Sequence, residues 1–536
     1  MGAGPDHCAG GRPRYLPRTP LEQDQSLDAR HRGALNSAGG QPMIAKVAQL
    51  AMPSVHYLAI APILVLLGGS LSLMFVTAMT RARVSAVVAT SVTVVTAVSA
   101  FALSFFQWRD VSMHGSTTTL AHAIALDGFG VLASAAIALG VGLTALVAHD
   151  WAHRAHVVGA EFHILALASA SGAMMMAQAN DLIVIFLGLE ILSIGLYVLV
   201  AFDRHRSGSA EAALKYFLLG GFASAIFIYG VALTYGGAGS TNLSSIAYFL
   251  AHNFILQPGV LVAGLGLMLV GFAFKVAAVP FHVWSPDVYE GAPSPVTGYM
   301  ASIVKVGAFA AVLRVIFGAL TTQSESWRPL VWGLVVLSTL IGAAVALVQR
   351  NIKRLLAYSS ISQAGFMLLG LWSASPSGVA GTLYYVVTYL PVVIATFAVV
   401  TLVGGEGETS HDLDHYRGLA RRQPLLGAAF AVLLLSQAGA PFTTGFFAKF
   451  AVITSAVDAG GSWLAVIAMV AAAIGGFFYV RLVLSLYSDD EGAGVRVAVP
   501  RLTGAVIAIG SVSAVLFGVW PGPIANLAHH AYLLLP

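Results

Sequence analysis

Long apolar stretches follow one another along the chain with only short polar breaks between them. A hydrocarbon core about 30 Å thick needs roughly 20 apolar residues per helix, and a helix satisfies its own backbone polar groups in lipid. The pattern therefore predicts an all-α polytopic membrane protein of about 14 transmembrane helices. The predicted spans are 56–78, 84–106, 127–148, 161–179, 181–202, 212–236, 258–283, 294–320, 329–349, 353–374, 379–403, 424–455, 461–487 and 502–524.

The first 54 residues differ from the rest, because they are rich in Gly, Pro, Arg and Asp and show no apolar periodicity. Such a composition predicts a disordered N-terminal tail over 1–54, and Met43 is an alternative start. The remaining chain is expected to divide into three N-terminal helices (55–160), a first five-helix repeat (161–320), a second five-helix repeat (329–487) and a C-terminal loop, helix and tail (488–536).

Most basic residues outside the tail lie in every second loop, on one side of the membrane, and this asymmetry predicts the orientation. The loops on the opposite side contain only Arg109 and Arg328. The basic side is expected to be cytoplasmic, and an even number of spans then places both termini on the outer side. The basic loops contain Arg81, Arg83, Arg154, Arg204, Arg206, Arg350, Lys353, Arg354, Arg417, Arg421, Arg422, Arg496 and Arg501.

Composition excludes several classes of protein. With 58% hydrophobic and 9% charged residues, the chain cannot cover a water-soluble surface. Its basic residues are scattered and not clustered with aromatics, which argues against nucleic-acid binding. The single cysteine, Cys8, excludes an intramolecular disulfide and a cysteine-ligated cluster or haem. His149 and His163 straddle a polar loop, so haem ligation by this pair is not expected either.

Two apolar spans contain a proline near the middle, in the sequences Ala278-Val279-Pro280 and Gly439-Ala440-Pro441. Proline removes a backbone hydrogen bond and clashes with the preceding turn, so both helices are expected to break. The breaks lie five spans apart, and an odd offset reverses direction through the membrane, as in an inverted-topology repeat. The alternative is that these prolines only kink their helices, since Pro391 also lies within a span.

Four ionisable residues lie deep within predicted spans: Glu190, Lys275, Lys305 and Lys449. A charge at the centre of a bilayer costs about 2.5–3.5 kcal/mol on insertion scales, so a functional need is expected to retain it. Groups of opposite charge that share a buried site respond to small movements of their neighbours, which suits a proton relay. The alternative is a static ion pair between Glu190 and one lysine.

Other polar residues allow two interpretations each. Lys215 follows Glu211 by four residues, so it is either a relay residue or one half of a surface ion pair. His282 follows the first break and is either a proton carrier between water and a buried lysine or a satisfied interfacial histidine. Arg314 is predicted to be a snorkelling anchor and Asp181 an N-cap.

Four stretches carry a family resemblance: EAALKYFLLGGFASAIFIYG, GFAFKVAAVPFHVWSPDVYEGAPSPVTGYMASIVKVGAF, RLLAYSSISQAGF and GTLYYVVTYL. They resemble the antiporter-like membrane subunits of respiratory complex I. Within that family they are most similar to the subunit N branch of bacterial NADH:quinone oxidoreductase, the counterpart of mitochondrial subunit two. The resemblance covers spans four to thirteen.

The resemblance implies a function and a set of site residues. Family members move protons along a midplane axis, whose positions match Glu190, Lys275, Lys305 and Lys449 in this sequence. The resemblance implies no cofactor and no metal in this chain, with NADH, flavin, iron–sulfur clusters and quinone in partner subunits. The expected partners are other complex I membrane subunits, including further antiporter-like ones, in the bacterial plasma membrane.

Two positions depart from the family pattern. Gln363 stands where a histidine is frequent, and an amide cannot carry a proton charge, so a proton path there would need water. Ala440 stands where the second break often has the first of two prolines, which predicts a milder break.

Two other functions remain open from the sequence. A Mrp-type sodium/proton antiporter subunit has the same ancestry and the same midplane charges. A membrane scaffold would use the buried charges only to specify helix packing.

Overall fold

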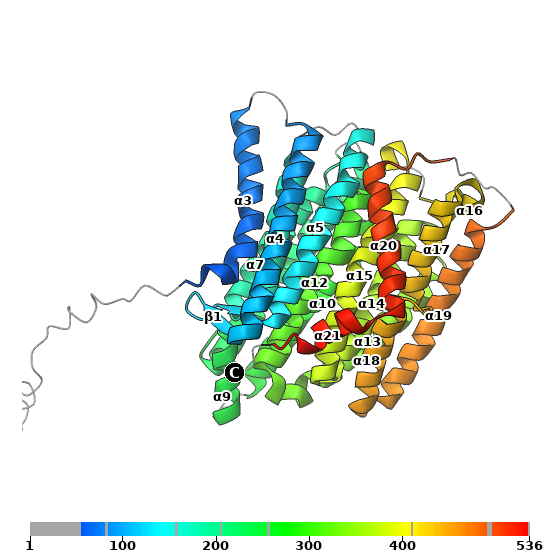
Figure 1. Ribbon diagram of the computed structural model, residues 1–536. Helices are drawn as coiled ribbons and strands as arrows, with labels where there is room; N and C mark the ends of the chain where they lie inside the picture. Colours follow the sequence, from blue (N-terminus) through cyan, green and yellow to red (C-terminus); the bar gives the residue numbers. More distant parts are fainter. Residues whose placement is uncertain are drawn as a thin grey trace, which may run out of the picture. The chain divides into compact units, whose positions relative to one another are not determined.

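The computed structural model describes residues 55–80, 84–155, 159–203, 206–253, 258–408, 411–489 and 496–533. The predictions for the N-terminal tail and for Met43 lie outside these residues. Apart from one short hairpin, the described part of the chain is a bundle of helices that run up and down (Figure 1).

Three helices and a hairpin form the N-terminal part: α3 (Tyr57–Met79), α4 (Ala86–His114), β1 (Thr117–Thr119), β2 (Ile124–Leu126) and α5 (Gly128–Arg154). The two strands pair antiparallel, with Thr117 opposite Leu126. Large apolar side chains on α3 and α4 are exposed, Phe75 and Phe105 among them. These two helices therefore present a lipid-compatible surface.

The next helices are α6 (Glu161–Gln178), α7 (Leu182–Val200), α8 (Ser207–Ala238), α9 (Leu243–His252), α10 (Pro258–Val276), α11 (Trp284–Gly291) and α12 (Ser294–Ala319). After the short turn η1 (Thr321–Gln323) follow α13 (Ser324–Ala346), α14 (Ile352–Trp372), α15 (Pro376–Val403), η2 (Glu406–Glu408), η3 (Leu413–Tyr416), α16 (Leu419–Arg422), α17 (Pro424–Ala438), α18 (Thr444–Asp458), α19 (Ser462–Leu486), α20 (Arg501–Val519) and α21 (Gly522–His530).

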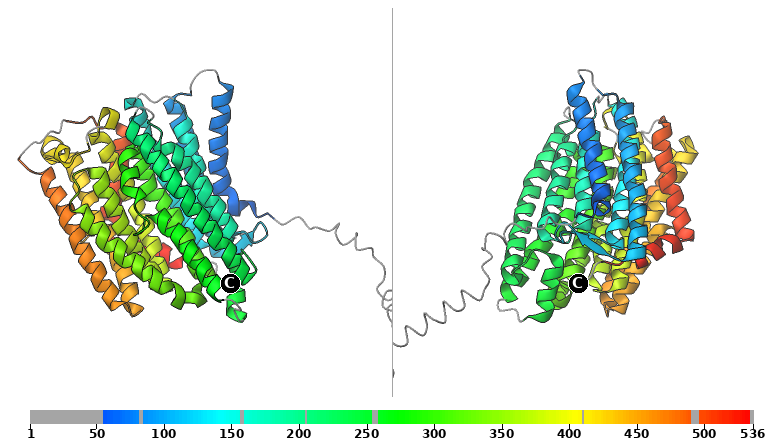
Figure 2. Two further views of the ribbon diagram at one scale, coloured as in Figure 1. Left: turned by 180° about the vertical axis from the view of Figure 1, so that it is seen from behind. Right: turned by 60° about the vertical axis from the view of Figure 1, so that its left-hand side comes forward.

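Within the described residues, 12 helices are long and apolar enough to cross a membrane. The helix α6, of 18 residues, and the interrupted pair α17–α18 complete the fourteen crossings that the hydropathy pattern predicts. The described part is thus an all-α polytopic membrane protein, as expected. The short helix α21 runs crosswise along the side of the bundle, below α20 in Figure 1, and packs against α15 and α5 (Figures 1 and 2).

The helix α12 forms the centre of the bundle, since every one of its residues is buried. It packs against α15, α5 and α6. The helices α14 and α15 are also mostly buried. Charged side chains on these central helices are therefore remote from lipid and must find partners inside the protein.

Both predicted helix breaks are present. The helix α10 ends at Val276, Ala277 adopts φ 59°, and α11 begins at Trp284. The amide of Ala278 donates to the carbonyl of Ala273, the bond of a Schellman C-cap. The amide of Val279, freed by the break, donates to Ser338 Oγ of α13 at 2.9 Å.

The second break is shorter than the first, since residues 439–443 separate α17 from α18 and residues 277–283 separate α10 from α11. The effect of Ala440 on this break stays a prediction. Gly439 adopts φ 88° and ends α17, and the amide of Ala440 donates to the carbonyl of Leu435 in the same Schellman arrangement. Because glycine reaches the left-handed region without strain, it ends the helix on its own and a proline pair is not needed.

The element order repeats around these breaks. Five crossings from α6 to α12 and five from α13 to α19 each have the interrupted helix in fourth place. This order agrees with the inverted repeat, while the boundaries of the two repeats stay a prediction.

Candidate functional site

Lys275 lies one residue before the first break, with 3% of its surface exposed. Its Nζ donates to Ser193 Oγ of α7 at 2.7 Å and to Tyr216 OH of α8 at 3.1 Å. Glu190 lies on α7 one turn before Ser193. One oxygen of Glu190, Oε1, is buried and has no hydrogen-bond partner in the described structure.

Glu190 and Lys275 form no direct ion pair among the described residues, which argues against a static pair between them. A small cavity lies beside Lys275 and is also lined by Ser193 and Tyr197. Its volume of about 10 Å³ is close to what one water molecule needs. A water there would find polar partners on both α7 and α10.

Lys305 lies on the central helix α12 and is also 3% exposed. Its Nζ donates to the carbonyl of Ser360 on α14 and lies 5.7 Å from the ring centroid of Tyr389. Tyr289 OH of α11 is 3.4 Å from Ser360 Oγ. A carbonyl and an aromatic face both solvate an ammonium group without neutralising it.

Aromatic rings separate Lys275 from Lys305. Tyr216 stacks on Trp284 with ring centroids 4.7 Å apart, and Trp284 lies edge-on to Tyr289 at 6.4 Å. The indole of Trp284 donates to the carbonyl of Phe274 at 3.0 Å, which fixes the ring. No continuous chain of hydrogen bonds joins the two lysines through the described side chains.

Lys449 lies on α18 just after the second break and is 7% exposed. Its Nζ donates to the backbone carbonyls of Gln437 at 3.1 Å and Ala438 at 2.7 Å. These carbonyls are among the last four of α17, which have no partner within the helix. The break therefore creates the site that holds this ammonium group.

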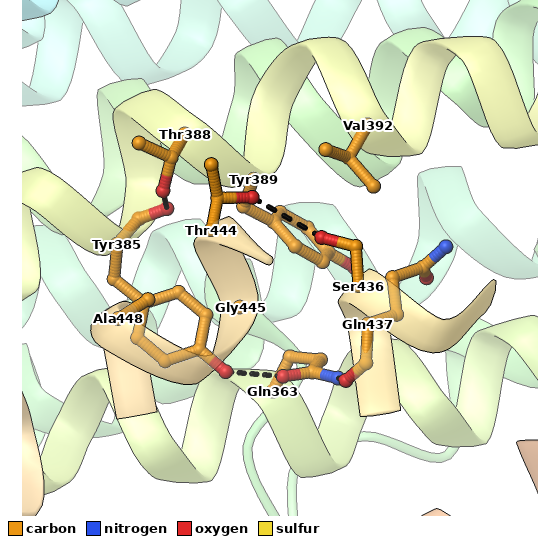
Figure 3. A pocket seen from close by; sticks show the side chains of 10 residues that line it. All are labelled: Gln363, Tyr385, Thr388, Tyr389, Val392, Ser436, Gln437, Thr444, Gly445 and Ala448. Carbon is orange, nitrogen blue, oxygen red and sulfur yellow. Dashed lines mark hydrogen bonds between the residues drawn. The ribbon is translucent and has the colours of Figure 1, made fainter. Parts of the chain in front are cut away.

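Hydrogen bonds between neutral groups connect α17 with α15 through α14, and Figure 3 shows the three residues that take part, Gln437, Gln363 and Tyr385. Gln363 Nε2 donates to the Gln437 carbonyl at 2.8 Å, the same oxygen that Lys449 contacts. Tyr385 OH donates to Gln363 Oε1. Tyr385, Gln363 and Gln437 also line a cavity of about 10 Å³.

One face of α14 connects the second and third lysine sites. Ser360 contacts Lys305, and Gln363 shares a carbonyl with Lys449. Phe366 lies 4.9 Å from the Nζ of Lys449. Residues three apart on a helix share a face, so Ser360, Gln363 and Phe366 form one stripe. Lys305 and Lys449 therefore both lie against this stripe of α14, which contains an aromatic ring as well as two polar residues.

Lys215 and His282 lie outside these three lysine sites. Lys215 is 42% exposed and pairs with both Glu211 at 2.7 Å and Asp287 at 2.8 Å. His282 packs near Tyr358, with ring centroids 6.4 Å apart, and has no hydrogen bond with a lysine in the described structure. Pro280 and Pro441 lie within the two breaks.

Arg314 is not a snorkelling anchor, and this expectation is wrong. It is 1% exposed, and its guanidinium donates to both carboxylate oxygens of Asp127 at 2.8 and 2.6 Å. Its Nε donates to the carbonyl of Ala177 at 2.5 Å. Asp127 lies directly before α5 and is fully buried. The bidentate pair with this carboxylate stabilises the guanidinium charge inside the protein, so the Arg314 side chain does not extend to the membrane surface. Asp181 caps α7 as predicted.

A second buried ion pair, Lys353 with Glu408, was not anticipated. Lys353 is completely buried, and its Nζ is 3.3 Å from Glu408 Oε2 and 2.5 Å from the carbonyl of Ala292. Burial alone would raise the pKa of Glu408, but Lys353, His411 and Ser294 hold that pKa well below its usual range. The sequence shows Lys353 only as one of several basic residues at a helix start.

His149 and His163 meet at one hydroxyl, since Thr90 Oγ1 is 3.0 Å from the first ring and 3.3 Å from the second. In the part of the chain that the structure describes, no three His, Cys, Asp or Glu side chains gather as metal ligands.

Known proteins place this arrangement in a family. The family model "NADH:quinone oxidoreductase/Mrp antiporter, TM" matches residues 179–475, which include every residue of the lysine sites. The chain is 42% identical over 391 residues to NADH-quinone oxidoreductase subunit N of Mycobacterium tuberculosis, covering 72% of this chain and 73% of that protein.

Solved structures give the same result. A chain of respiratory complex I from Thermus thermophilus superimposes with a TM-score of 0.75 at 32% identity, covering 87% of this chain and 99% of that one. A chain of the Mrp complex from Dietzia has a TM-score of 0.76 at 21% identity, covering 89% and 96%, which shows a common fold. This protein therefore belongs to the antiporter-like membrane subunits of NADH:quinone oxidoreductase, in the family that these share with Mrp antiporters.

Proposed function

We propose that this chain is a proton-translocating, non-redox membrane subunit of a NADH:quinone oxidoreductase. Protons move along Glu190, Lys275, Lys305 and Lys449, driven by quinone reduction in other subunits. NADH, flavin, iron–sulfur clusters and quinone belong to those partners, which include further antiporter-like subunits. The chain lies in the bacterial plasma membrane with its basic loops in the cytoplasm and both termini outside.

One observation carries this proposal. Three lysines, each more than nine-tenths buried, contact neutral oxygens and aromatic faces and have no carboxylate within ion-pair distance among the described residues. A buried charge without a counter-ion is costly to keep, and a structural role alone would be served by an apolar side chain. A lysine that gains and loses a proton during turnover would account for this cost, because its function requires the charged form.

The contacts suggest how the axis works. Lys305 and Lys449 both lie against α14. The amide of Gln363 cannot carry a proton charge, so water in the cavity beside Gln363 would have to pass the proton between the two lysines. Between Lys275 and Lys305, the column formed by the rings of Tyr216, Trp284 and Tyr289 has to move or admit water before a proton passes. That column is a natural gate against leakage, since each charge moving down a 100 mV potential releases about 2.3 kcal/mol.

A Mrp-type sodium/proton antiporter subunit is the second candidate, because the fold is shared with the Dietzia Mrp chain. A sodium path would need oxygen ligands at the midplane. The lysine sites instead present ammonium groups to every carbonyl that they reach.

The test uses a strain that lacks this gene, complemented with the wild type or with Glu190→Gln. NADH-driven acidification of inverted membrane vesicles should return with the wild type and fall by more than half with Glu190→Gln, at unchanged assembly. Lys353→Met is the matched control, since it removes a buried lysine outside the axis and should reduce assembly instead. Full acidification with Glu190→Gln would refute the relay, and sodium transport without NADH would favour the antiporter.

A further inference from the structure

A group of histidines surrounds one threonine hydroxyl at the basic end of the bundle, where α4, α5 and α6 meet. Thr90 Oγ1 of α4 is 3.0 Å from His149 Nδ1 of α5 and 3.3 Å from His163 Nε2 of α6. His153 lies one turn further along α5, and its ring is edge-on to that of His149 with centroids 4.7 Å apart. The lysine axis does not explain this group.

The group runs from the surface into the core. His153 is exposed and His149 is half-buried. Thr90 is 5% exposed and His163 is 4% exposed. The second ring nitrogen of His163, Nδ1, is buried and has no hydrogen-bond partner among the described residues. An apolar side chain would pack there at lower cost, because a buried polar atom without a partner costs free energy.

The Thr90 hydroxyl can pass a proton between the two rings. It has one hydrogen, so when it donates to His163 Nε2 it accepts from an N–H at His149 Nδ1. A proton that binds His149 Nε2 lets the Nδ1 proton move to Thr90 and the Thr90 proton move to His163. His163 then releases its Nδ1 proton on the inner side. One proton has entered, one has left, and both rings have exchanged tautomers.

Polar groups continue inward from His163 along α6. His163, Ala166 and Ser169 follow at intervals of three residues, so they lie on one side of this helix. Tyr299 OH of α12 donates to the carbonyl of Ala166 at 3.0 Å, midway along this stripe. At 1.5 Å per residue, the step from His163 to Ser169 is about 9 Å.

The stripe ends beside the first lysine site. Ser169 Oγ donates to the carbonyl of Leu192 on α7 at 3.0 Å. The next residue of α7 is Ser193, whose hydroxyl accepts from Lys275 at 2.7 Å. The polar groups on α6 therefore lead from the basic end of the bundle to the helix that contacts Lys275.

We propose that His149, Thr90 and His163 form a proton entry path from the basic side of the membrane to the lysine axis. Protons pass from His163 along the hydroxyls of Tyr299 and Ser169 to Lys275. The inference rests on the proposed function, because it names the residues that supply that axis with protons.

The experiment compares Thr90→Val with Thr93→Val in inverted membrane vesicles that contain the intact complex. Valine has the shape of threonine without the hydroxyl. Thr93 is the matched control, because it is also buried on α4 and its hydroxyl donates to the carbonyl of Ala89 in its own helix. NADH-driven acidification should fall by more than half in Thr90→Val at unchanged assembly. It should stay at the wild-type level in Thr93→Val and return in Thr90→Ser.

His163→Gln separates proton transfer from packing, and it keeps the test open if Thr90→Val fails to assemble. The amide can still hydrogen-bond to Thr90 but cannot carry a proton charge. Acidification should again fall by more than half. Wild-type acidification in His163→Gln, or equal losses in Thr90→Val and Thr93→Val, would overturn the entry path.

Lys275→Met in the same vesicles distinguishes the entry path from the proposed function. If Lys275→Met lowers acidification while Thr90→Val and His163→Gln do not, the entry path is wrong and the lysine axis stands. If none of the three variants lowers acidification, both proposals are wrong.

Discussion

The buried pair of Arg314 and Asp127 should be worth more to stability than any other side-chain contact between the N-terminal helices and α12. Arg314→Met removes two charge-assisted hydrogen bonds to Asp127 and one to Ala177. It also leaves a carboxylate buried without its counter-ion. Breaking such a pair costs about 3–5 kcal/mol, whereas removing both charges together is often nearly neutral.

The double variant distinguishes the charge from the packing. Asp127→Asn removes the charge but keeps the oxygen that accepts the amide of Gly130 and caps α5. The two single variants should each be clearly destabilised, and Asp127→Asn/Arg314→Met should recover about 2–3 kcal/mol relative to their sum. Retention of this subunit in the purified complex is measured against temperature by size-exclusion chromatography.

The control for this cycle is Arg328→Met, which removes a half-buried arginine that stacks 4.3 Å from the ring centroid of Trp372 and donates to the carbonyls of Trp372 and Ala459. It strands no buried carboxylate, so it should cost only about 1–2 kcal/mol. If the double variant is as unstable as the two single losses added together, the two side chains do not act as a pair, and the reasoning fails.

Three other variants have defined outcomes. Glu408→Gln leaves Lys353 buried without its carboxylate and should lower the free energy of unfolding at neutral pH by about 3–5 kcal/mol. Folding lowers the pKa of Glu408, so its stabilising contribution is present above about pH 4.3 and is lost as the pH falls further. The difference in stability between this variant and the wild type should therefore shrink in acid. Gly439→Ala places a Cβ atom on a residue with φ 88° and 3.0 Å from Lys449 Cδ, so it should lower the free energy of unfolding by about 1–2 kcal/mol and slow proton pumping. Pumping at the wild-type rate would contradict the placement of Lys449. Tyr385→Phe removes the hydroxyl that orients Gln363 and should slow pumping several-fold without loss of assembly; an unchanged rate would remove Gln363 from the path.

Much of the fold could be predicted from the sequence, because a membrane restricts a chain to helices of one length. The fourteen crossings and both breaks follow from apolar run length and from proline. The residue at which the second break begins did not follow, since Gly439 ends α17 and its left-handed conformation depends on the chain after it.

The site was predictable in its charges but not in its partners. Glu190, Lys275, Lys305 and Lys449 stand out because a hydrophobic run normally excludes them. Their contacts with Ser193, Ser360 and Gln437 join segments far apart in the sequence. No spacing rule brings such residues together without coordinates.

Charges near helix ends were the least predictable. Lys353 and Arg314 both lie close enough to loops to suggest exposure, and both are buried against carboxylates. The signal that could have found them is the presence of Asp127 and Glu408 next to predicted spans. A carboxylate at the membrane boundary needs a partner, and a basic residue on another helix is the natural candidate.

The proton stoichiometry of the intact complex with Lys305→Met tests the central claim most directly. Methionine keeps the length and packing of the side chain and removes the charge that contacts Ser360. The purified complex in proteoliposomes should oxidise NADH with an artificial electron acceptor at the wild-type rate, which shows intact assembly. Its NADH:quinone activity should move fewer protons per electron pair than the wild type. An unchanged ratio would mean that protons do not pass through Lys305, and it would contradict a relay along the four buried charges.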